Sequence, residues 1–221
     1  MNIQPISLQV SETIGTVSAE YILPETSKCM LTLAHGAGAG MNHAFMVALA
    51  HALAQRGIAT LRFNFPFIEN NKKRADVPGV AHKTIEAAIK HALENYADLP
   101  LFVSGKSFGG RMSSQYLALH PSSKIKGLIF YGFPLHPAGK PSVDRAAHLK
   151  EVEQPMLFLQ GSRDALAEWN LIEQVCSVLP KATLIKIEGA DHTFKAGKQD
   201  TISMLADYSN GWIEDIIRMP N

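Results

Sequence analysis

The feature that most constrains this chain is the segment GKSFG at positions 105–109, which has the pattern G-x-S-x-G. An apolar run typical of a buried strand, Leu101–Ser104, comes before it, and apolar residues at helical spacing, from Met112 to Leu119, come after it. A serine between two glycines at a strand-to-helix junction predicts a tight turn that lifts the hydroxyl group out of a sheet. The free N–H groups and the positive dipole end of the helix favour developing negative charge there. We therefore predict that Ser107 is a nucleophile rather than part of a plain glycine-rich turn.

Short apolar runs alternate with segments of helical periodicity along the chain, which predicts a mostly parallel sheet with helices on both faces. The first two expected strands, at residues 6–10 and 17–22, fit an antiparallel hairpin at the sheet edge, because the first of them alternates apolar and polar residues. The other expected strands are Met30–Ala34, Ala59–Phe63, Leu101–Ser104, Gly127–Tyr131, Met156–Leu159 and Thr183–Ile187. The sequence therefore predicts an α/β fold with about eight strands.

Apolar stripes at helical spacing mark the main expected helices, and we expect each stripe to pack in the core. The stripes are Ile85, Ile89, Ala92 and Tyr96; Met112, Tyr116 and Leu119; and Ile202, Leu205, Trp212 and Ile216. The chain has 221 residues, of which 46% are hydrophobic, and it shows no internal repeat or linker. We therefore expect residues 1–221 to form a single domain.

Composition argues against several classes of partner. The net charge is +1, so a basic surface for nucleic acid is not expected. The N-terminal residues lack the basic and apolar regions of a signal peptide, and no apolar stretch approaches the ~20 residues that a membrane helix needs. The two cysteines, Cys29 and Cys176, are expected to be free thiols in a reducing compartment. These features predict a soluble cytoplasmic protein that contacts neither nucleic acid nor membrane.

An acid and a base for the nucleophile can be placed by chain order, because folds with this turn present Ser, then the acid, then His. Asp164 follows the strand that ends at Leu159, and His192 follows the strand that ends at Ile187. We therefore predict His192 as the base and Asp164 as the carboxylate that orients it, although Asp164 would also suit a helix N-cap. Asp144 is the second choice for the acid, and Asp191 is a weaker alternative because a direct sequence neighbour seldom reaches the outer nitrogen of its own histidine.

A glycine-rich segment, HGAGAG at positions 35–40, follows the strand that ends at Ala34 and precedes a helix expected to begin near Asn42. In such a turn backbone N–H groups can point into the site, so we expect the N–H groups of Ala37 and Phe108 to stabilise an oxyanion. A phosphate-binding loop is the alternative, but the segment lacks the Lys-Ser/Thr ending and the G-x-G-x-x-G spacing. We expect His35 to have a structural role within the loop.

The connection between Tyr131 and Met156 is only about 25 residues long, so no cap domain is expected over the site. We expect His43 to touch substrate, and we expect aromatic and apolar residues to form an open rim that suits an apolar acyl or aromatic group. The expected rim residues are Phe65, Pro66, Phe67, Phe133, Pro134, Leu135 and Trp169. No His, Cys, Asp or Glu cluster has metal-ligand spacing, so neither a metal nor another cofactor is expected.

The ordered motifs HGAGAG, RFNFPF, GKSFGG, GSRD and GADH resemble those of small, lidless α/β-hydrolases close to dienelactone hydrolase. The chain resembles more closely an uncharacterised hydrolase-like family that includes a vertebrate testis-expressed protein and a chromatin-complex subunit. The resemblance implies the α/β-hydrolase fold, a triad of Ser107, Asp164 and His192, and oxyanion donors at Ala37 and Phe108. Dienelactone hydrolase itself uses a cysteine nucleophile, so the serine at position 107 argues against a dienelactone substrate.

The motifs together predict a serine hydrolase, of the carboxylesterase or thioesterase type, that cleaves a carboxylic ester or related acyl bond through an acyl-enzyme. The expected partner is a small-molecule acyl substrate. The alternative is a non-catalytic interaction module that has kept the fold and a relic triad, as the resemblance implies for some relatives. The complete set of site residues favours the enzyme, because a relic should tolerate losses at one or more of these positions.

Overall fold

The structure is a computed structural model, and it describes residues 1–219 of the chain. Its centre is an eight-stranded sheet with the strand order β1-β2-β4-β3-β5-β6-β7-β8. The strands are β1 (Asn2–Ser11), β2 (Gly15–Leu23), β3 (Cys29–Ala34), β4 (Ile58–Phe63), β5 (Leu101–Lys106), β6 (Ile125–Tyr131), β7 (Met156–Gly161) and β8 (Ala182–Ile187). Strands β3 to β8 all pair in parallel, whereas β1 pairs antiparallel with β2, and β2 with β4. The predicted parallel sheet with an N-terminal hairpin is confirmed.

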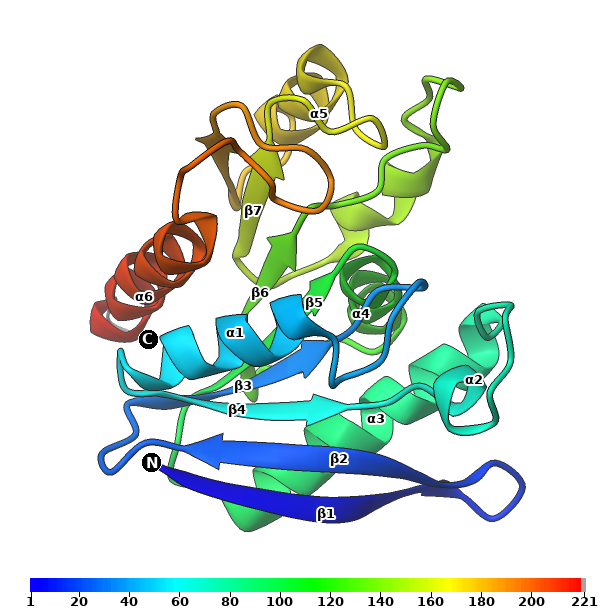
Figure 1. The fold of residues 1–221 in the computed structure, drawn as a ribbon, viewed down its shortest axis with the longest axis vertical. Coiled ribbons are helices and arrows are strands. Elements are labelled where there is room, and N and C mark those ends of the chain that lie inside the picture. The colour runs from blue at the N-terminus through cyan, green and yellow to red at the C-terminus, as the bar shows by residue number, and fades with distance from the viewer. Residues whose placement is uncertain (220–221) are drawn as a thin grey trace.

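Helices cover both faces of the sheet, as predicted (Figure 1). They are α1 (Ala44–Ala54), α2 (Pro66–Glu69), α3 (Pro78–Asn95), α4 (Phe108–Leu119), the 3₁₀ segment η1 (Asp144–Glu151), α5 (Trp169–Ser177) and α6 (Thr201–Arg218). Helices α1 and α6 pack in one core cluster, and α3, α4 and α5 pack in the other. Strands β3, β4 and β7 are buried along their whole length because both of their faces are covered.

The helical stripes lie mostly in these two clusters, with one exception. Leu119 is 66% exposed, so its expected place in the core is wrong. It is the last residue of α4, and the neighbouring Leu117 is fully buried in the core instead. A stripe read from spacing alone does not show where the helix passes beyond the element that covers it.

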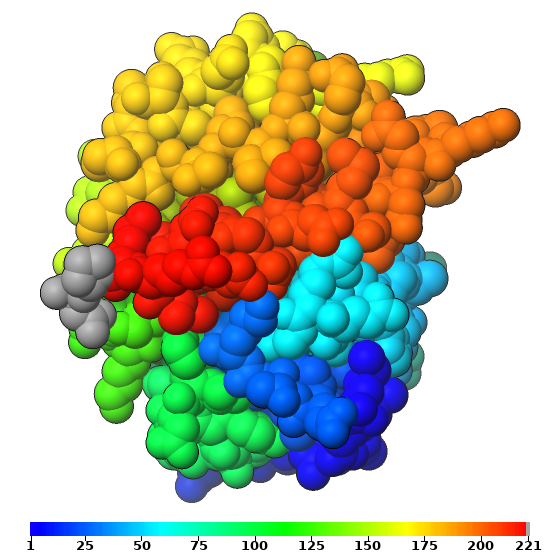
Figure 2. Space-filling model, turned by 90° about the vertical axis from the view of Figure 1, so that its left-hand side faces the viewer, coloured from blue at the N-terminus to red at the C-terminus, as the bar shows by residue number. Residues whose placement is uncertain are grey.

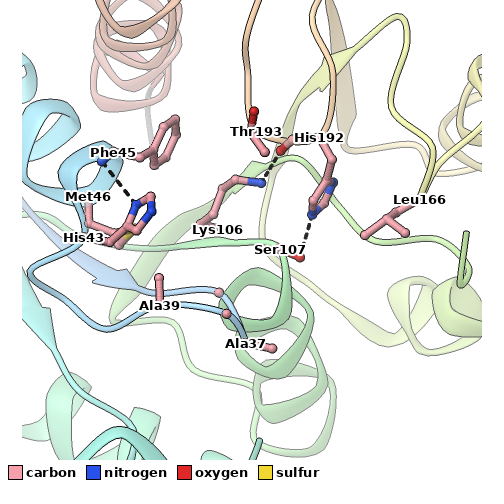
Figure 3. Close-up of a pocket in the computed structure, with 12 residues that line it drawn as sticks. Ala37, Ala39, His43, Phe45, Met46, Lys106, Ser107, Leu166, His192 and Thr193 are labelled. Carbon is pink, nitrogen blue, oxygen red and sulfur yellow. Dashed lines mark hydrogen bonds between the residues drawn. The ribbon is translucent and has the colours of Figure 1, made fainter. Parts of the chain in front are cut away.

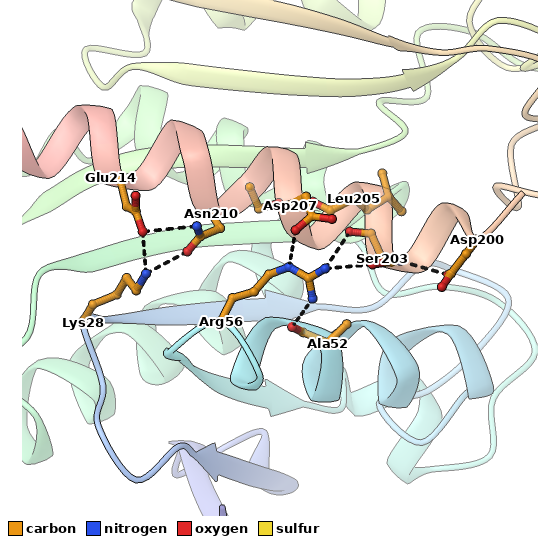
Figure 4. Close-up of polar contacts among 10 residues, drawn as sticks. Lys28, Ala52, Arg56, Asp200, Ser203, Leu205, Asp207, Asn210 and Glu214 are labelled. Carbon is orange, nitrogen blue, oxygen red and sulfur yellow. Dashed lines mark hydrogen bonds and ion pairs between the residues drawn. The ribbon is translucent and has the colours of Figure 1, made fainter.

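Two groups of polar contacts hold the last helix, one from Arg56, just after α1, and one from Lys28, just before β3 (Figure 4). Arg56 Nε donates to Asp207 Oδ1 at 2.7 Å, and its Nη2 donates to Ser203 Oγ at 2.8 Å. Lys28 Nζ reaches Glu214 Oε1 at 2.6 Å. Figure 2 shows α6, in red, lying against the cyan segment that contains α1. These contacts hold α6 in place, and with it the C-terminal end of the loop between β8 and α6.

The connection between β6 and β7, residues 132–155, contains η1 and no cap domain, as predicted. Among residues 1–219, no helix combines the length and the apolar character needed to cross a membrane. Because no cap covers it, the edge where the carboxyl ends of the parallel strands meet is open. Open α/β sheets bind their ligands at this edge.

Candidate active site

Ser107 occupies a strained turn between β5 and α4. Its backbone has φ 51° and ψ −115°, a conformation that a non-glycine residue rarely adopts. Such strain costs of the order of 1–3 kcal/mol and persists only where the surrounding structure enforces it. Strand β5 ends at Lys106 and α4 begins at Phe108, so Ser107 lies at the N-terminus of the helix. This is the predicted strand–turn–helix geometry.

The glycines on either side of Ser107 are required by close backbone packing. A Cβ atom on Gly109 would lie 2.5 Å from Ala34 O and 2.6 Å from His35 O, which is closer than carbon and oxygen can approach. A Cβ atom on Gly105 would overlap the backbone of Gly109 and Gly110. Glycine at these two positions therefore lets α4 pack directly against the ends of β3 and β5.

We expect Gly109→Ala to lower the free energy of unfolding by about 3 kcal/mol, because the obstructing atoms belong to the backbone of β3 and cannot rotate away. Gly79→Ala is the matched control, since Gly79 is likewise the second residue of a helix but has open space around the added carbon. It should leave stability unchanged or raise it slightly. Urea unfolding of both variants makes the comparison, and equal stabilities would contradict this explanation of the turn.

Three side chains from separate segments form a continuous hydrogen-bonded chain. Ser107 Oγ lies 2.8 Å from His192 Nε2, and His192 Nδ1 lies 2.7 Å from Asp164 Oδ2. His192 belongs to the loop between β8 and α6, and Asp164 to the turn between β7 and α5. The structure thus brings together the three residues that the chain order singled out.

Asp164 is held as a buried acceptor. Its side chain is 1% exposed, and its Oδ2 also accepts a hydrogen bond from Gln160 Nε2 at 2.6 Å. Its Oδ1 accepts from the N–H of Leu166 at 2.8 Å, so the carboxylate fixes its own turn as well as the imidazole. Gln160 is oriented in turn, because its Oε1 accepts from the N–H of Phe133 at 2.9 Å.

The two alternative carboxylates lie elsewhere. Asp144 is an exposed residue in the first turn of η1. Asp191 Oδ1 accepts from Thr193 N, Thr193 Oγ1 and Lys195 N at 2.7–3.0 Å, so it closes the turn that follows β8. Burial raises the pKa of Asp191, and these hydrogen bonds outweigh that effect and leave it below the usual value.

The glycine-rich segment after β3 lies beside Ser107. A Cβ atom on Gly36 would lie 3.6 Å from Ser107 Cβ, and Ala37 lines the pocket next to it. The N–H of Phe108 is the first in α4 and has no acceptor within the helix by geometry. His35 braces this segment, because its Nδ1 donates to Gly36 O at 2.7 Å and its Nε2 accepts from Phe65 N at 3.0 Å. Burial lowers the pKa of His35 to about 4, so the ring is neutral and can donate a hydrogen bond from one nitrogen while it accepts one at the other.

A pocket of about 380 Å³ opens at Ser107 (Figure 3). Its lining residues are Gly36, Ala37, Gly38, Ala39, His43, Phe45, Met46, Lys106, Ser107, Leu166, His192 and Thr193. His43 lies on its wall as the N-cap of α1, where its Nδ1 accepts from Phe45 N at 3.3 Å. The wall is mainly apolar, and it comes from the segment after β3, the start of α1 and the two loops that carry Asp164 and His192.

The expected rim is wrong at six of its seven positions. The residues Phe65, Pro66, Phe67, Phe133, Pro134 and Leu135 are all buried. Phe65 packs edge-on against Phe108 with ring centroids 5.3 Å apart, and Phe133 packs against Phe130 at 5.2 Å. Large rings that follow a strand gain more by burial beneath the loops than by exposure at a mouth. Trp169 is half-buried at the start of α5, where Lys186 Nζ lies 4.8 Å from its ring, and it lies outside the set that lines the pocket.

Sequence reasoning missed the apolar pocket walls. Phe45 and Met46 come two and three residues after His43, and Leu166 and Thr193 each come within two residues of a predicted site residue. Proximity in sequence to those residues was the available signal. Lys106 lies inside the GKSFG motif, but the contact that its side chain makes in the pocket is with His192, which is 86 positions away in sequence. Among residues 1–219, no group of three or more His, Cys, Asp or Glu side chains could hold a metal ion.

A mostly parallel sheet with an N-terminal hairpin, no cap, and a strained serine after its fifth strand defines the class of α/β hydrolases. The family model described as "Alpha/beta hydrolase domain" matches residues 27–214, and the chain therefore belongs to that family.

Solved structures agree on the fold. A serine hydrolase homologue from Coxiella burnetii superposes with a TM-score of 0.78 at 19% identity, covering 94% of this chain and 98% of that one. Dienelactone hydrolase from Anabaena variabilis also gives a TM-score of 0.78, at 18% identity and 97% coverage of both chains. At these identities the likeness shows the fold, and it confirms the predicted lidless α/β-hydrolase architecture.

A curated relative from Mycobacterium tuberculosis, named as a candidate phosphoribosyl transferase, is 26% identical over 204 residues. The match covers 90% of this chain but 44% of the relative, so the chain spans less than half the length of the curated relatives it matches.

Proposed function

We propose that this protein is a serine hydrolase that cleaves a carboxylic ester or related acyl bond through a triad of Ser107, His192 and Asp164. The observation that carries the proposal is the hydrogen-bonded chain of 2.8 Å and 2.7 Å from Ser107 Oγ through the imidazole to the Asp164 carboxylate. Its first member lies in a strained turn at a helix N-terminus. Family membership supports hydrolase activity in general.

The geometry suits acyl transfer in two stages. His192 Nε2 takes the proton of Ser107 Oγ as that oxygen attacks the carbonyl carbon, and Asp164 stabilises the imidazolium that forms. The N–H groups of Phe108 and Ala37 receive the oxyanion. His192 then protonates the leaving group, and a water molecule activated by the same imidazole hydrolyses the acyl-enzyme and regenerates Ser107.

The pocket suggests a small, largely apolar acyl group. Phe45, Met46 and Leu166 supply apolar walls, and a volume of about 380 Å³ is near the lower end of the range for small-molecule sites. We propose His43 as a substrate contact because it lies on the same wall. Cys29 and Cys176 are both unpaired and buried, which supports work in a reducing compartment such as the cytoplasm.

The finer family resemblance is also part of the proposal. The motifs and the structural likeness to dienelactone hydrolase support a place among lidless hydrolases of that type. The motifs alone support the closer relationship to the testis-expressed-protein family. The competing function is a non-catalytic interaction module. In that case Ser107 would react with neither an ester nor a fluorophosphonate probe.

Labelling with a fluorophosphonate probe tests the proposed function directly. The wild-type protein should gain one covalent adduct, and mass spectrometry of its peptides should place that adduct on Ser107. An unlabelled, folded wild-type protein would favour the interaction module. Peptide mapping matters because an adduct on another serine would reject this nucleophile while leaving the hydrolase class intact.

The absence of a cap predicts a preference in acyl length. We expect p-nitrophenyl acetate and butyrate to be hydrolysed with a kcat/KM at least about 10-fold higher than emulsified long-chain triglycerides, since no cap supplies a large apolar surface that could open onto lipid. A series of p-nitrophenyl esters from two to sixteen carbons, with triglyceride emulsions in parallel, makes the measurement. Higher activity on the emulsions would contradict the open, small-acyl pocket.

A further inference from the structure

Lys106 connects the strand that carries the nucleophile with the loop that carries the base. It is the last residue of β5, next to Ser107 in the chain, and its side chain extends along the pocket (Figure 3). Its Nζ donates a hydrogen bond to the backbone carbonyl oxygen of His192 at 2.6 Å. The two residues are 86 positions apart in sequence, so this is a tertiary contact between two otherwise separate parts of the site.

The ammonium group of Lys106 is closely surrounded. It lies 5.2 Å from the ring centroid of Phe194 and 5.9 Å from that of Phe45, and these two rings stack 5.7 Å apart. A Cβ atom on Gly132 would lie 3.3 Å from Nζ, so the glycine leaves the space that the head group needs. Phe194 follows His192 in the same loop and has φ 65°, a left-handed conformation that turns the chain sharply at this point.

No carboxylate lies within 4 Å of Lys106 Nζ among residues 1–219, so its contact with the His192 carbonyl is not a by-product of an ion pair. Lys106 is half-buried, and a partly desolvated cation without an ion-pair partner is costly. A short charge-assisted bond to a carbonyl oxygen offsets part of that cost. An apolar side chain would fill the same space without this desolvation cost, so the lysine at this position indicates a role for its charged group.

We propose that Lys106 is a positioning residue for the base: it holds the backbone of His192 so that the imidazole spans Ser107 Oγ and the Asp164 carboxylate. The proposal rests on the proposed function and adds a residue that chain-order reasoning did not assign. A backbone contact is suited to this task because the side-chain nitrogens of His192 are both occupied. Loss of the contact would let the loop relax by a fraction of an ångström to about 1 Å, which is enough to cost up to ~10²-fold in rate.

The position of Lys106 also links the site to pH. Burial lowers the pKa of Lys106 to about 8, and the nearby carboxylates of Asp164 and Asp191 oppose that effect. The titratable groups that face it are these two carboxylates, His192 on the β8–α6 loop, and His43 across the pocket at the start of α1. Lys106 is therefore charged below pH 8 and neutral above it, and the bond to His192 weakens as pH rises through that value.

The test compares Lys106→Met with Lys198→Met, a control at an exposed lysine in the same loop. On a short p-nitrophenyl ester we expect Lys106→Met to lower kcat by about 10- to 100-fold with KM changed less than about twofold, and Lys198→Met to resemble the wild type. Wild-type kcat should fall as pH rises through about 8. This decline should be absent in Lys106→Met, and in Lys106→Arg it should move beyond pH ~10 because the guanidinium stays charged.

Four results separate the explanations. An unchanged kcat and pH profile in Lys106→Met would overturn the proposal, and a raised KM at constant kcat would overturn it in favour of substrate binding. A wild-type protein that neither reacts with fluorophosphonate nor turns over esters would reject the proposed function instead. The nuclear magnetic resonance signals of the His192 ring provide the measurement that does not need activity: they should shift or broaden in Lys106→Met and not in Lys198→Met, and unaltered signals would overturn the positioning role.

Discussion

Ser107→Ala is expected to abolish covalent labelling by a fluorophosphonate and to reduce ester turnover by roughly 10⁴–10⁶-fold. The loss should be this large because the proposed mechanism makes Ser107 Oγ the attacking atom, which lies 2.8 Å from the imidazole Nε2 that would activate it. Residual turnover should remain above the uncatalysed rate, since the oxyanion donors and the pocket would still bind and polarise the carbonyl.

Two companion variants make this result independent of folding. Ser107→Gly removes the same hydroxyl group but relieves the left-handed backbone conformation at φ 51°, so it should be at least as stable as the wild type and equally inactive. Ser177→Ala, at an exposed serine near the end of α5, should retain full labelling and turnover. Undiminished labelling of the folded Ser107→Ala protein would remove Ser107 from the mechanism.

Asp164→Asn is expected to cut turnover by about 10⁴-fold, the loss known for the same change in a serine protease triad. The physical cause is hydrogen-bond polarity. Oδ2 accepts from both Gln160 Nε2 and His192 Nδ1, and an amide nitrogen in its place would face two donors. Gln160 cannot simply turn over, because its Oε1 already accepts from Phe133 N. The asparagine would therefore favour the wrong imidazole tautomer and reduce stability by about 1–3 kcal/mol.

The comparison with the other two carboxylates makes this prediction specific. Asp191→Asn keeps an oxygen for its turn, and Asp144 is exposed, so each change should cost less than about 10-fold in kcat. The three variants should be assayed on one ester at one pH, with urea unfolding to confirm that each is folded. If Asp144→Asn or Asp191→Asn is the inactive one and Asp164→Asn works, the carboxylate has been assigned to the wrong residue.

Local pattern was sufficient for the sheet and for the order of the site residues. Buried strands produce continuous apolar runs, so six parallel strands could be located within a few residues of their ends. The carboxyl ends of parallel strands share one edge, which is why Asp164 and His192 could be expected beside Ser107 although 28 positions separate them from each other. The glycines at 105 and 109 were informative because the backbone contacts around them exclude any Cβ atom.

The walls of the pocket could not be predicted in the same way. Phe65 and Phe133 follow strands at the correct edge, yet both are fully buried, whereas Phe45 lines the pocket from the first turn of α1. Whether a loop residue points into a site or beneath it depends on backbone turns and on neighbours far away in sequence. The direction of a loop side chain cannot be predicted from sequence periodicity, because loops lack a repeating geometry.

The sequence by itself determined the class of fold, the strained serine turn, and the order of Ser107, Asp164 and His192 at the ends of successive strands, because these follow from local backbone sterics and from strand alternation with helices. Only the tertiary structure decided which carboxylate meets His192, which aromatic rings are buried, and that Lys106 reaches the His192 carbonyl at 2.6 Å. Those outcomes depend on side-chain directions and sub-ångström distances between segments that are remote in sequence, and they are established when the sheet and its loops pack together.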